Sequence, residues 1–416
     1  MTTTQTTPSA LAEPDVDVRP SWIGMLCLAN IGLWMASISP AQLLLPAQLD
    51  HIAPADKVGA LALISSLGYL ITIVITPLTG LASDVTTSRW GRRRPWILAG
   101  TVIGAAFLVL LGAQTTVAGV LVCWVSAQAG FSLVAAAIAA SIPDLVPRRQ
   151  RGVVSAWAGF PQPLGALLGV ALVALVFTTT FAGYAAVAIL GAALTLPFVF
   201  FTREIRLLPG ERDRPTVVDF LRSFWVNPIA HPDFGWAWIC RFLMQLGTTV
   251  PIVYLYFIVQ DTLHIEDPST EVLVLIALST LGATVCCLVA GYLSDRLRRR
   301  KPFVWSSCVL LAVGTVTLAL VPTWAGMMIG VLIFGCGLGA YLAVDYALVT
   351  EVLPEAGERG KDLGVMYVAN TLPQVLAPLL GGVIVGMLGG YSALLILSGL
   401  ITVGGALAVL PIRAVR

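Results

Sequence analysis

The sequence predicts an all-α membrane protein in which twelve transmembrane helices form two pseudo-symmetric halves of six. The first observation is composition, because 57% of the 416 residues are hydrophobic and only 11% are charged. A water-soluble chain of this length carries roughly a quarter charged residues, so most of this surface must face the interior of a bilayer. The other two observations are a series of long apolar runs and an internal repeat. The net charge of +2 gives no reason to expect nucleic acid as a partner.

Each apolar run of about 20 residues can cross the ~30 Å hydrocarbon core as a helix. Twelve are expected, at 21–45, 58–82, 95–114, 117–141, 152–178, 182–201, 234–260, 272–294, 302–321, 324–350, 363–388 and 391–411. The longest polar stretch separates the sixth run from the seventh. We therefore expect a disordered cytoplasmic tail (1–20), a six-helix bundle (21–201), a cytoplasmic linker (202–233), a second bundle (234–411) and a short cytoplasmic tail (412–416).

The basic residues predict the orientation. With both termini inside, the internal segments hold 22 of the 24 Lys and Arg residues, while the outer loops hold only Lys57 and one apolar run contains Arg241. Basic residues are retained on the cytoplasmic side of a membrane. We expect a multi-pass protein of the bacterial cytoplasmic (inner) membrane with both termini in the cytoplasm, and we expect it to be a monomer.

The two halves match each other in sequence. GLASD begins at Gly80 and GYLSD at Gly291, which places the two motifs 211 residues apart. Later in each half the separation is 207 residues, since Gly130 matches Gly337 and the segment DLVP matches EVLP. This indicates a six-helix unit that was duplicated in parallel.

A parallel repeat of six helices, with Gly-x-x-x-Asp and an arginine cluster after the second helix of each half, resembles the major facilitator superfamily across the whole chain. The segment SDVTTSRWGRRRPWILAG, residues 83–100, is similar more narrowly to glycoside, pentoside and hexuronide symporters, including melibiose permease, and to plant sucrose transporters. The resemblance implies a secondary transporter with substrate bound between the halves and exposed alternately to each side. It also implies a cytoplasmic gate formed by Gly80, Asp84, Arg89, Arg92, Gly291, Asp295 and Arg299 or Arg300.

Two ionisable side chains fall deep inside apolar runs, Arg241 in the seventh and Asp345 in the tenth. Each costs roughly 2.5–3.5 kcal/mol at a helix centre, so each needs a compensating interaction. They lie at similar depth, and we expect an ion pair that responds to protonation of the carboxyl group and couples transport to protons. The alternative is a permanent pair that only holds two helices together. The second and fourth runs lack the carboxylates that the related sodium and sucrose transporters carry, so protons are the expected coupling ion.

Polar and aromatic residues at helical spacing are the candidate substrate ligands. Aromatic rings beside amides suit a sugar, whose C–H faces stack and whose hydroxyl groups need donors and acceptors. Interhelical hydrogen bonding or interfacial anchoring is the alternative role for each of them. The candidates are Asn30, Trp34, Gln128, Trp157, Gln162, Gln245, Tyr341, Tyr367, Asn370 and Gln374.

Other functions remain in competition. A proton-coupled exporter of a drug or metabolite is the main alternative, although GFPQPLGALLG only partly resembles the GPxxGG-like element of exporters. A membrane enzyme is less well supported, because His51, His231 and His264 are scattered over loops. No phosphate-binding signature, metal cluster or disulfide framework is recognisable, so we expect neither a cofactor nor a metal, and no catalysis.

Overall fold

The computed structural model describes residues 14–177, 179–204, 206–208, 232–297, 300–352, 359–388 and 390–412, with side chains throughout except at 295, 346–352 and 359–364. Within these ranges the regular structure is helical and no strand occurs. Twelve helical segments are long and apolar enough to cross a membrane, which confirms the predicted number. The elements are α1 (Pro20–Ser39), a π-helical turn (Pro40–Leu44), α2 (Leu45–Ile52), α3 (Lys57–Asp84), α4 (Arg94–Gly112), α5 (Val117–Leu145), α6 (Arg148–Gly159), α7 (Pro161–Val176), α8 (Thr180–Phe201), α10 (Pro232–Leu263), α11 (Ser269–Leu297), α12 (Lys301–Leu320), α13 (Trp324–Val352), α14 (Arg359–Leu388) and α15 (Tyr391–Ala408).

Prolines interrupt two of the spans. The first span continues to Ile52, and its π-helical turn begins at Pro40. Because Pro40 and Pro46 lack backbone N–H groups, the regular α-helical ladder loses two donors around this turn. The fifth span divides into α6 and α7 at Phe160, immediately before Pro161. Both spans can therefore bend at a defined point.

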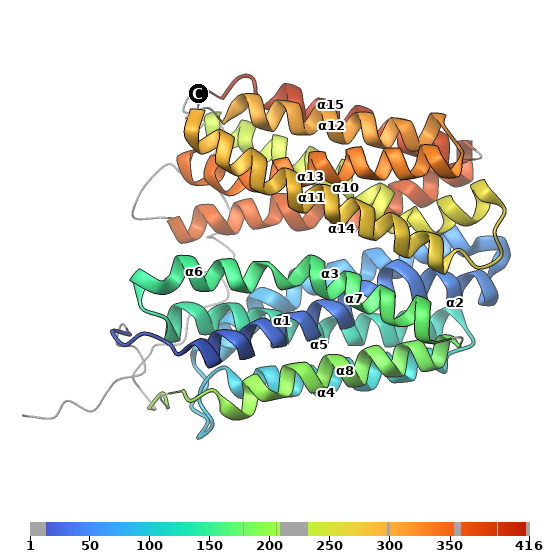
Figure 1. Ribbon diagram of the computed structural model, residues 1–416. Helices are drawn as coiled ribbons and strands as arrows, with labels where there is room; N and C mark the ends of the chain where they lie inside the picture. Colours follow the sequence, from blue (N-terminus) through green and yellow to red (C-terminus); the bar gives the residue numbers. More distant parts are fainter. Residues whose placement is uncertain are drawn as a thin grey trace, which may run out of the picture. The chain divides into compact units, whose positions relative to one another are not determined.

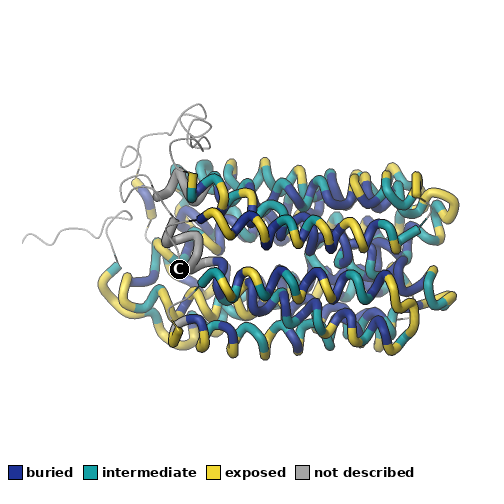
Figure 2. Tube along the Cα trace, turned by 90° about the horizontal axis from the view of Figure 1, so that it is seen from above, coloured by how far each residue is buried: buried dark blue, intermediate teal, exposed yellow. Residues whose placement is uncertain are grey.

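The outward surfaces of the helices carry large apolar side chains. Leu175, Leu288 and Leu400 are 68%, 71% and 62% exposed, and Figure 2 shows exposed positions recurring along many of the helices. Contiguous exposure of such side chains is unfavourable in water and favourable in hydrocarbon. The burial pattern thus agrees with a membrane protein.

The chain forms two compact units, of which the first comprises residues 1–40 and 71–215 and the second residues 41–70 and 216–416. In the first unit α1 packs against α7 and α8, and α4 against α5 and α8; in the second, α10 packs against α14 and α15, and α12 against α13 and α15. Figure 1 shows α4 beside α8 and α12 beside α15. The two units therefore use equivalent helix pairs, as the sequence repeat predicts.

The repeat extends to individual glycine contacts. A Cβ atom added at Gly130 would lie 2.5 Å from the backbone nitrogen of Gly104, and one added at Gly337 would lie 2.7 Å from that of Leu311. Gly104 and Leu311 are themselves 207 positions apart. Only glycine allows the two helices to approach this closely.

The structure describes only parts of the expected N-terminal tail and of the expected linker between the bundles. Residues 1–13 of the expected tail lie outside the described residues; further along, the backbone N–H of Val18 donates to the amide of Gln150 at 2.9 Å and Arg149 pairs with Asp17 at 2.9 Å. Residues 209–231 of the expected linker lie outside the described residues. The repeat boundaries at 21–201 and 234–411 stay a prediction, since residues 41–70 pack in the second unit.

Candidate functional site

Four charged residues of the first unit form a compact group, called here the arginine cluster: Asp84, Arg92, Arg93 and Asp144. Arg93 lies between two carboxylates, 2.5 Å from Asp84 and 2.8 Å from Asp144. Arg92 pairs with Asp144 at 2.6 Å. The guanidinium of Arg93 also donates to the hydroxyl of Ser83. Two buried arginines thus join the end of α3, the start of α4 and the end of α5.

Glu204 approaches the same cluster from the segment after α8. Its carboxylate accepts the backbone N–H of Arg93 at 2.9 Å. Burial raises the pKa of Glu204 above its ordinary value, against the opposing effect of this hydrogen bond and of the nearby positive charge of Arg94. Arg94 in turn donates to the carbonyl groups of Val199 and Phe200 near the end of α8.

The sequence analysis grouped Asp84 with Arg89 and Arg92 as gate residues, and that role stays a prediction. Asp84 is paired, but with Arg93 rather than with Arg89 or Arg92. Arg89 is exposed and forms no ion pair within the described part of the chain. Gly80 is not at a close helix contact as expected, because an added Cβ atom would meet no described atom within 4 Å. Asp144 was missed, although its place in the repeated DLVP segment was a usable signal.

The second unit repeats part of the cluster. Arg300 donates to the hydroxyl of Ser294 at 2.9 Å, and these residues are the repeat equivalents of Arg93 and Ser83. Gly291 lies in ordinary contact with Ala343, 3.8 Å from an added Cβ atom. Arg299 and the side chain of Asp295 lie outside the described residues. Arg300 therefore makes the contact that is equivalent to that of Arg93 with Ser83.

An ion pair joins α10 and α13 inside the second unit. Arg241 and Asp345 are 3.0 Å apart, which confirms the predicted contact. The hydroxyl of Tyr341, one turn before Asp345 on α13, donates to the other carboxylate oxygen at 2.7 Å. Asp345 is 3% exposed and is the one fully buried carboxylate among the described side chains. Its burial needs both partners, because an unpaired carboxylate at this depth would be neutral.

The candidate substrate ligands of the first unit fall into two groups. Asn30 is buried and donates to the carbonyl of Leu26 at 2.9 Å, while Gln128 is buried and accepts from Ser37 at 3.2 Å. These two contacts are helix-internal and interhelical hydrogen bonds. Trp34 is half-buried; Trp157 and Gln162, on either side of the break in the fifth span, are exposed.

The candidates of the second unit lie on three helices. Tyr341 belongs to the ion-pair site just described. Gln245, one turn beyond Arg241 on α10, donates to Thr249 at 3.4 Å. Gln374 donates to the carbonyl of Asn370 at 3.0 Å on α14, and Tyr367, one turn before Asn370, is half-buried. Gln245, Asn370 and Gln374 are also half-buried.

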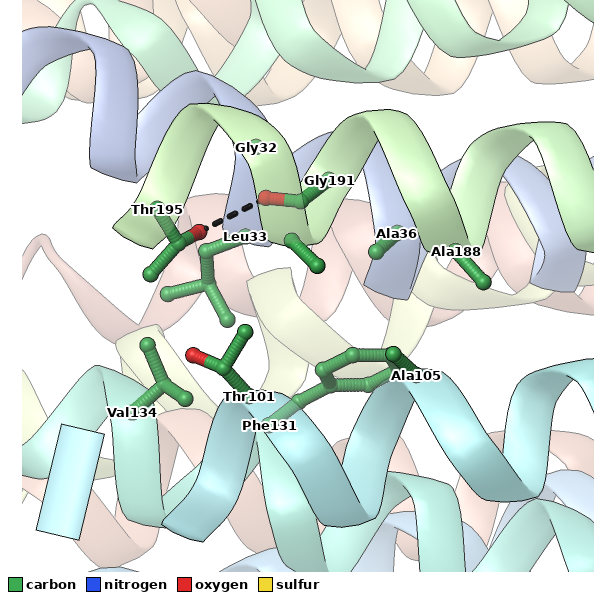
Figure 3. A pocket seen from close by; sticks show the side chains of 11 residues that line it. Gly32, Leu33, Ala36, Thr101, Ala105, Phe131, Val134, Ala188, Gly191 and Thr195 are labelled. Atoms are coloured by element: carbon green, nitrogen blue, oxygen red, sulfur yellow. Dashed lines mark hydrogen bonds between the residues drawn. The ribbon is translucent and has the colours of Figure 1, made fainter. Parts of the chain in front are cut away.

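One enclosed space in the first unit is too small for a substrate. Figure 3 shows it between α1, α4, α5 and α8, lined by small or apolar side chains such as Ala36, Ala105 and Phe131. Its volume is about 10 Å³, which is the volume needed for about one water molecule. The hydroxyl of Thr195 at its edge bonds to the carbonyl of Gly191 at 2.8 Å. It is a gap in the packing, and none of the candidate ligands lines it.

A second charged group in the second unit, the Lys57 network, consists of Asp50, Lys57, Gln260, Asp261 and Tyr391. The ammonium of Lys57 lies 3.0 Å from Asp50 and 2.8 Å from Asp261, and it donates to Gln260 at 2.9 Å. Gln260 donates to Asp50 at 2.8 Å, and Tyr391 donates to Asp261 at 2.7 Å. Residues 41–70 are thereby tied to α10 and α15. The sequence placed Lys57 alone among acidic residues but did not predict these pairs.

The fold and these sites define a polytopic membrane transporter. The model of the Major Facilitator Superfamily matches residues 22–306 and 237–416. The chain therefore belongs to the major facilitator superfamily, and secondary transport is the activity of its class. This confirms the family that the repeated gate motif indicated.

Several individual proteins are similar over shorter segments. The chain is 45% identical to a lactose permease of Lactobacillus helveticus over 58 residues, which is 14% of this chain and 9% of that permease. It is 47% identical to a rice (Oryza sativa subsp. japonica) sucrose transport protein over 45 residues, 11% of this chain and 8% of the relative. An uncharacterized MFS-type transporter of Mycobacterium tuberculosis is 38% identical over 102 residues, 24% of this chain and 15% of the relative.

A solved structure extends the comparison to the whole fold. The crystal structure of the nucleoside transporter NupG superposes with a TM-score of 0.73 at 15% identity, covering 94% of this chain and 98% of NupG. At this identity the similarity shows the fold alone.

The arginine cluster can be tested by its effect on stability. Arg93→Gln removes the cation shared by Asp84 and Asp144, and we expect a loss of roughly 2–3 kcal/mol, less than a fully buried pair because both carboxylates are partly exposed. The measurement is the midpoint of thermal unfolding in detergent. Arg149→Gln is the matched control, since its pair with Asp17 is exposed and contributes little. Equal shifts in the two variants would contradict the role assigned to Arg93.

Glu204 should make stability depend on pH. Because burial raises its pKa, the folded protein binds the proton more tightly than the unfolded chain, so stability falls as the pH rises above the ordinary carboxyl range. The glutamine in Glu204→Gln cannot ionise. The unfolding temperature of this variant, relative to that of the parent protein, should therefore rise from acidic toward neutral pH. A difference between the two proteins that stays constant from about pH 4 upward would exclude this effect of burial.

Proposed function

We propose that the protein imports a sugar or glycoside together with protons, by alternating access. The observation that carries the coupling is the buried Asp345 carboxylate, held by Arg241 at 3.0 Å and Tyr341 at 2.7 Å. A buried acid with one counter-charge can exchange a proton when its surroundings become hydrated. The half-buried amides of Gln245, Asn370 and Gln374 support a polar, uncharged substrate.

The substrate class rests on two supports. Among the relatives are a lactose permease and a sucrose transport protein, both named for sugars. Amide and aromatic groups within one helical turn of each other, as on α14, are suited to hydroxyl-rich ligands. The proposed ligands are the ten residues named from the sequence, and the proposed coupling pair is Asp345 with Arg241.

The coupling proposal predicts distinct effects of two substitutions. Asp345→Asn preserves shape and can still accept from Tyr341, but it cannot release a proton. Accumulation of a radiolabelled glycoside in vesicles under an imposed pH gradient should fall to the equilibrium level, while exchange of substrate at equal concentrations persists. Arg241→Gln alone should be more damaging than the double variant, because it leaves the carboxylate buried without its counter-charge.

The controls separate coupling from structure. Gln245 lies one turn from the ion pair, and Gln245→Asn does not change the charge. This variant should retain uphill accumulation of the glycoside even if its apparent affinity for the glycoside changes. Uphill accumulation by Asp345→Asn, or by the double variant, would show that the pair is structural and that the coupling site lies elsewhere. Failure of every tested glycoside in the parent protein, with uphill transport of another solute, would overturn the substrate class alone.

The Lys57 network supports a role as the outer gate. Ser66 on α3 donates to the carbonyl of Val375 in the second unit at 2.7 Å, whereas Thr72, six residues later, accepts from Ser132 in the first unit at 3.1 Å. The first span likewise passes from one unit to the other at Pro40, where the π-helical turn begins. We infer that residues 41–70 detach from α10 and α15 when the outer side opens.

This gate predicts an effect on access from outside. Lys57→Gln removes the cation between Asp50 and Asp261, at a cost of about 1–2 kcal/mol to the closed state. In a cysteine-free background, Ser66→Cys is a buried reporter, and its labelling by a maleimide should accelerate roughly 5–30-fold when Lys57 is replaced. Lys301→Gln is the control, since Lys301 makes only a 3.5 Å hydrogen bond to Leu410. Unchanged labelling would mean that the network does not hold the gate.

Orientation and location complete the proposal. The concentration of arginine near Asp84 and Asp144, against the single Lys57 in the loops at the other helix ends, supports cytoplasmic termini. The arginine cluster then holds the cytoplasmic side and the Lys57 network the outer side. We place the protein in a bacterial cytoplasmic membrane as a monomer.

A further inference from the structure

An open groove runs along the outer face of α4, beside the loop that leads into this helix. Its volume is about 460 Å³, and it is lined by Ser88, Arg89, Trp90, Pro95, Leu98, Ala99, Val102 and Ile103. The polar lining lies at one end, in the loop, and the apolar lining follows the helix. Val102 and Ile103 are exposed, as is Trp90.

A tight turn fixes the polar end of the groove. The backbone N–H of Gly91 donates to the carbonyl of Ser88 at 3.1 Å, so Arg89 and Trp90 occupy the two central positions of the turn. Gly91 has a φ of 99°, in the region that favours glycine. Arg89 and Trp90 are therefore held next to each other at the helix entrance.

Arg89 differs from the arginines that follow it. Arg92 and Arg93 are paired with carboxylates and Arg94 with carbonyl groups, whereas Arg89 has no ion pair or hydrogen bond within the described residues. Arg206 donates to the carbonyl of Thr87 at 3.4 Å and brings a second positive charge close to the same turn. An anion is thus the complementary partner at this end.

The apolar part of the groove has the length of one acyl chain in a leaflet. From Pro95 to Ile103 the helix rises about 12 Å, and half of the hydrocarbon core is about 15 Å thick. The α4 segment is long and apolar enough to cross a membrane, so phospholipid is the ligand expected against its exposed face. Tryptophan at such a position lies at the level of the lipid headgroups.

We propose that this groove binds one anionic phospholipid, with its phosphate on Arg89 and one acyl chain along Leu98, Val102 and Ile103. Arginine binds phosphate oxygens in a bidentate manner. This geometry favours a specific phosphate site at Arg89 over a diffuse attraction of lipid headgroups to the protein surface. The groove belongs to the first unit and the ion pair of α10 and α13 to the second, and the proposal does not depend on which solute is transported.

The test is lipid retention by the full chain. The protein is reconstituted in phosphatidylcholine vesicles containing a minor fraction of phosphatidylglycerol, extracted mildly, and analysed by native mass spectrometry. The parent protein should retain one phosphatidylglycerol in preference to phosphatidylcholine. Arg89→Gln should reduce this retention about fivefold, which corresponds to about 1 kcal/mol for one basic residue at a lipid surface.

Two further variants make the result specific. Arg149→Gln removes an equal charge from an exposed, paired arginine and should leave retention unchanged. Ala99→Phe fills the apolar groove without altering charge and should also reduce retention. Equal loss in Arg89→Gln and Arg149→Gln, equal retention of phosphatidylcholine by the parent protein, or complete displacement by inorganic phosphate would each overturn the proposal. Transport is not the readout, so failure here leaves the proposed function untouched.

Discussion

The structure depends on one constraint, which is that hydrocarbon offers no partner to a charge or to a backbone polar group. Every spanning segment is therefore helical, and the charged side chains gather where partners exist. Arg93 holds two carboxylates in the first unit, and Lys57 holds two in the second. Among the described carboxylates Asp345 alone is fully buried, and it contacts both a cation and a hydroxyl group. Outside these groups, small residues such as Gly130 and Gly337 allow close helix contacts, and hydrogen bonds such as that from Ser37 to Gln128 add polar contacts between helices.

Because charged groups and close-packed glycines lie in different places, each unit can be rigid while the proposed movement of residues 41–70 takes place. Glycine contacts such as those of Gly130 and Gly337 bring helix backbones together in each unit, and such close packing resists deformation. The segment 41–70 is different, since sequence assigns it to the first repeat and packing assigns it to the second unit. Its contacts include hydrogen bonds and ion pairs, which water can replace in the proposed opening of the outer side. The π-helical turn at Pro40 lies where the chain passes between the units.

The sequence predicted the fold well because hydrophobic length and charge position are direct consequences of the bilayer. It also predicted the pair of Arg241 and Asp345, since two isolated opposite charges at similar depth in apolar helices have few other partners that could compensate them. It did not predict that Arg93, rather than Arg89 or Arg92, joins Asp84, because four arginines within six residues are equivalent until the turn at Gly91 fixes their directions. The Lys57 network was missed for a related reason: its partners come from segments more than 200 positions apart, Lys57 to Gln260 and Asp261. Local pattern cannot reveal such pairs.

The three charged groups differ in what protonation would do to them. In the Lys57 network two carboxylates share one ammonium, so a proton on Asp50 or Asp261 would leave a neutral set with one ion pair intact. In the arginine cluster Asp84 and Asp144 face two arginines, so a proton would leave excess positive charge at a partly exposed position. At Asp345 a proton would remove the negative charge that lies 3.0 Å from Arg241, and this carboxyl group is the most buried of the three acidic positions. Protonation of Asp345 would therefore change the charge at the most buried of the three groups, which is the property that the proposed coupling site requires.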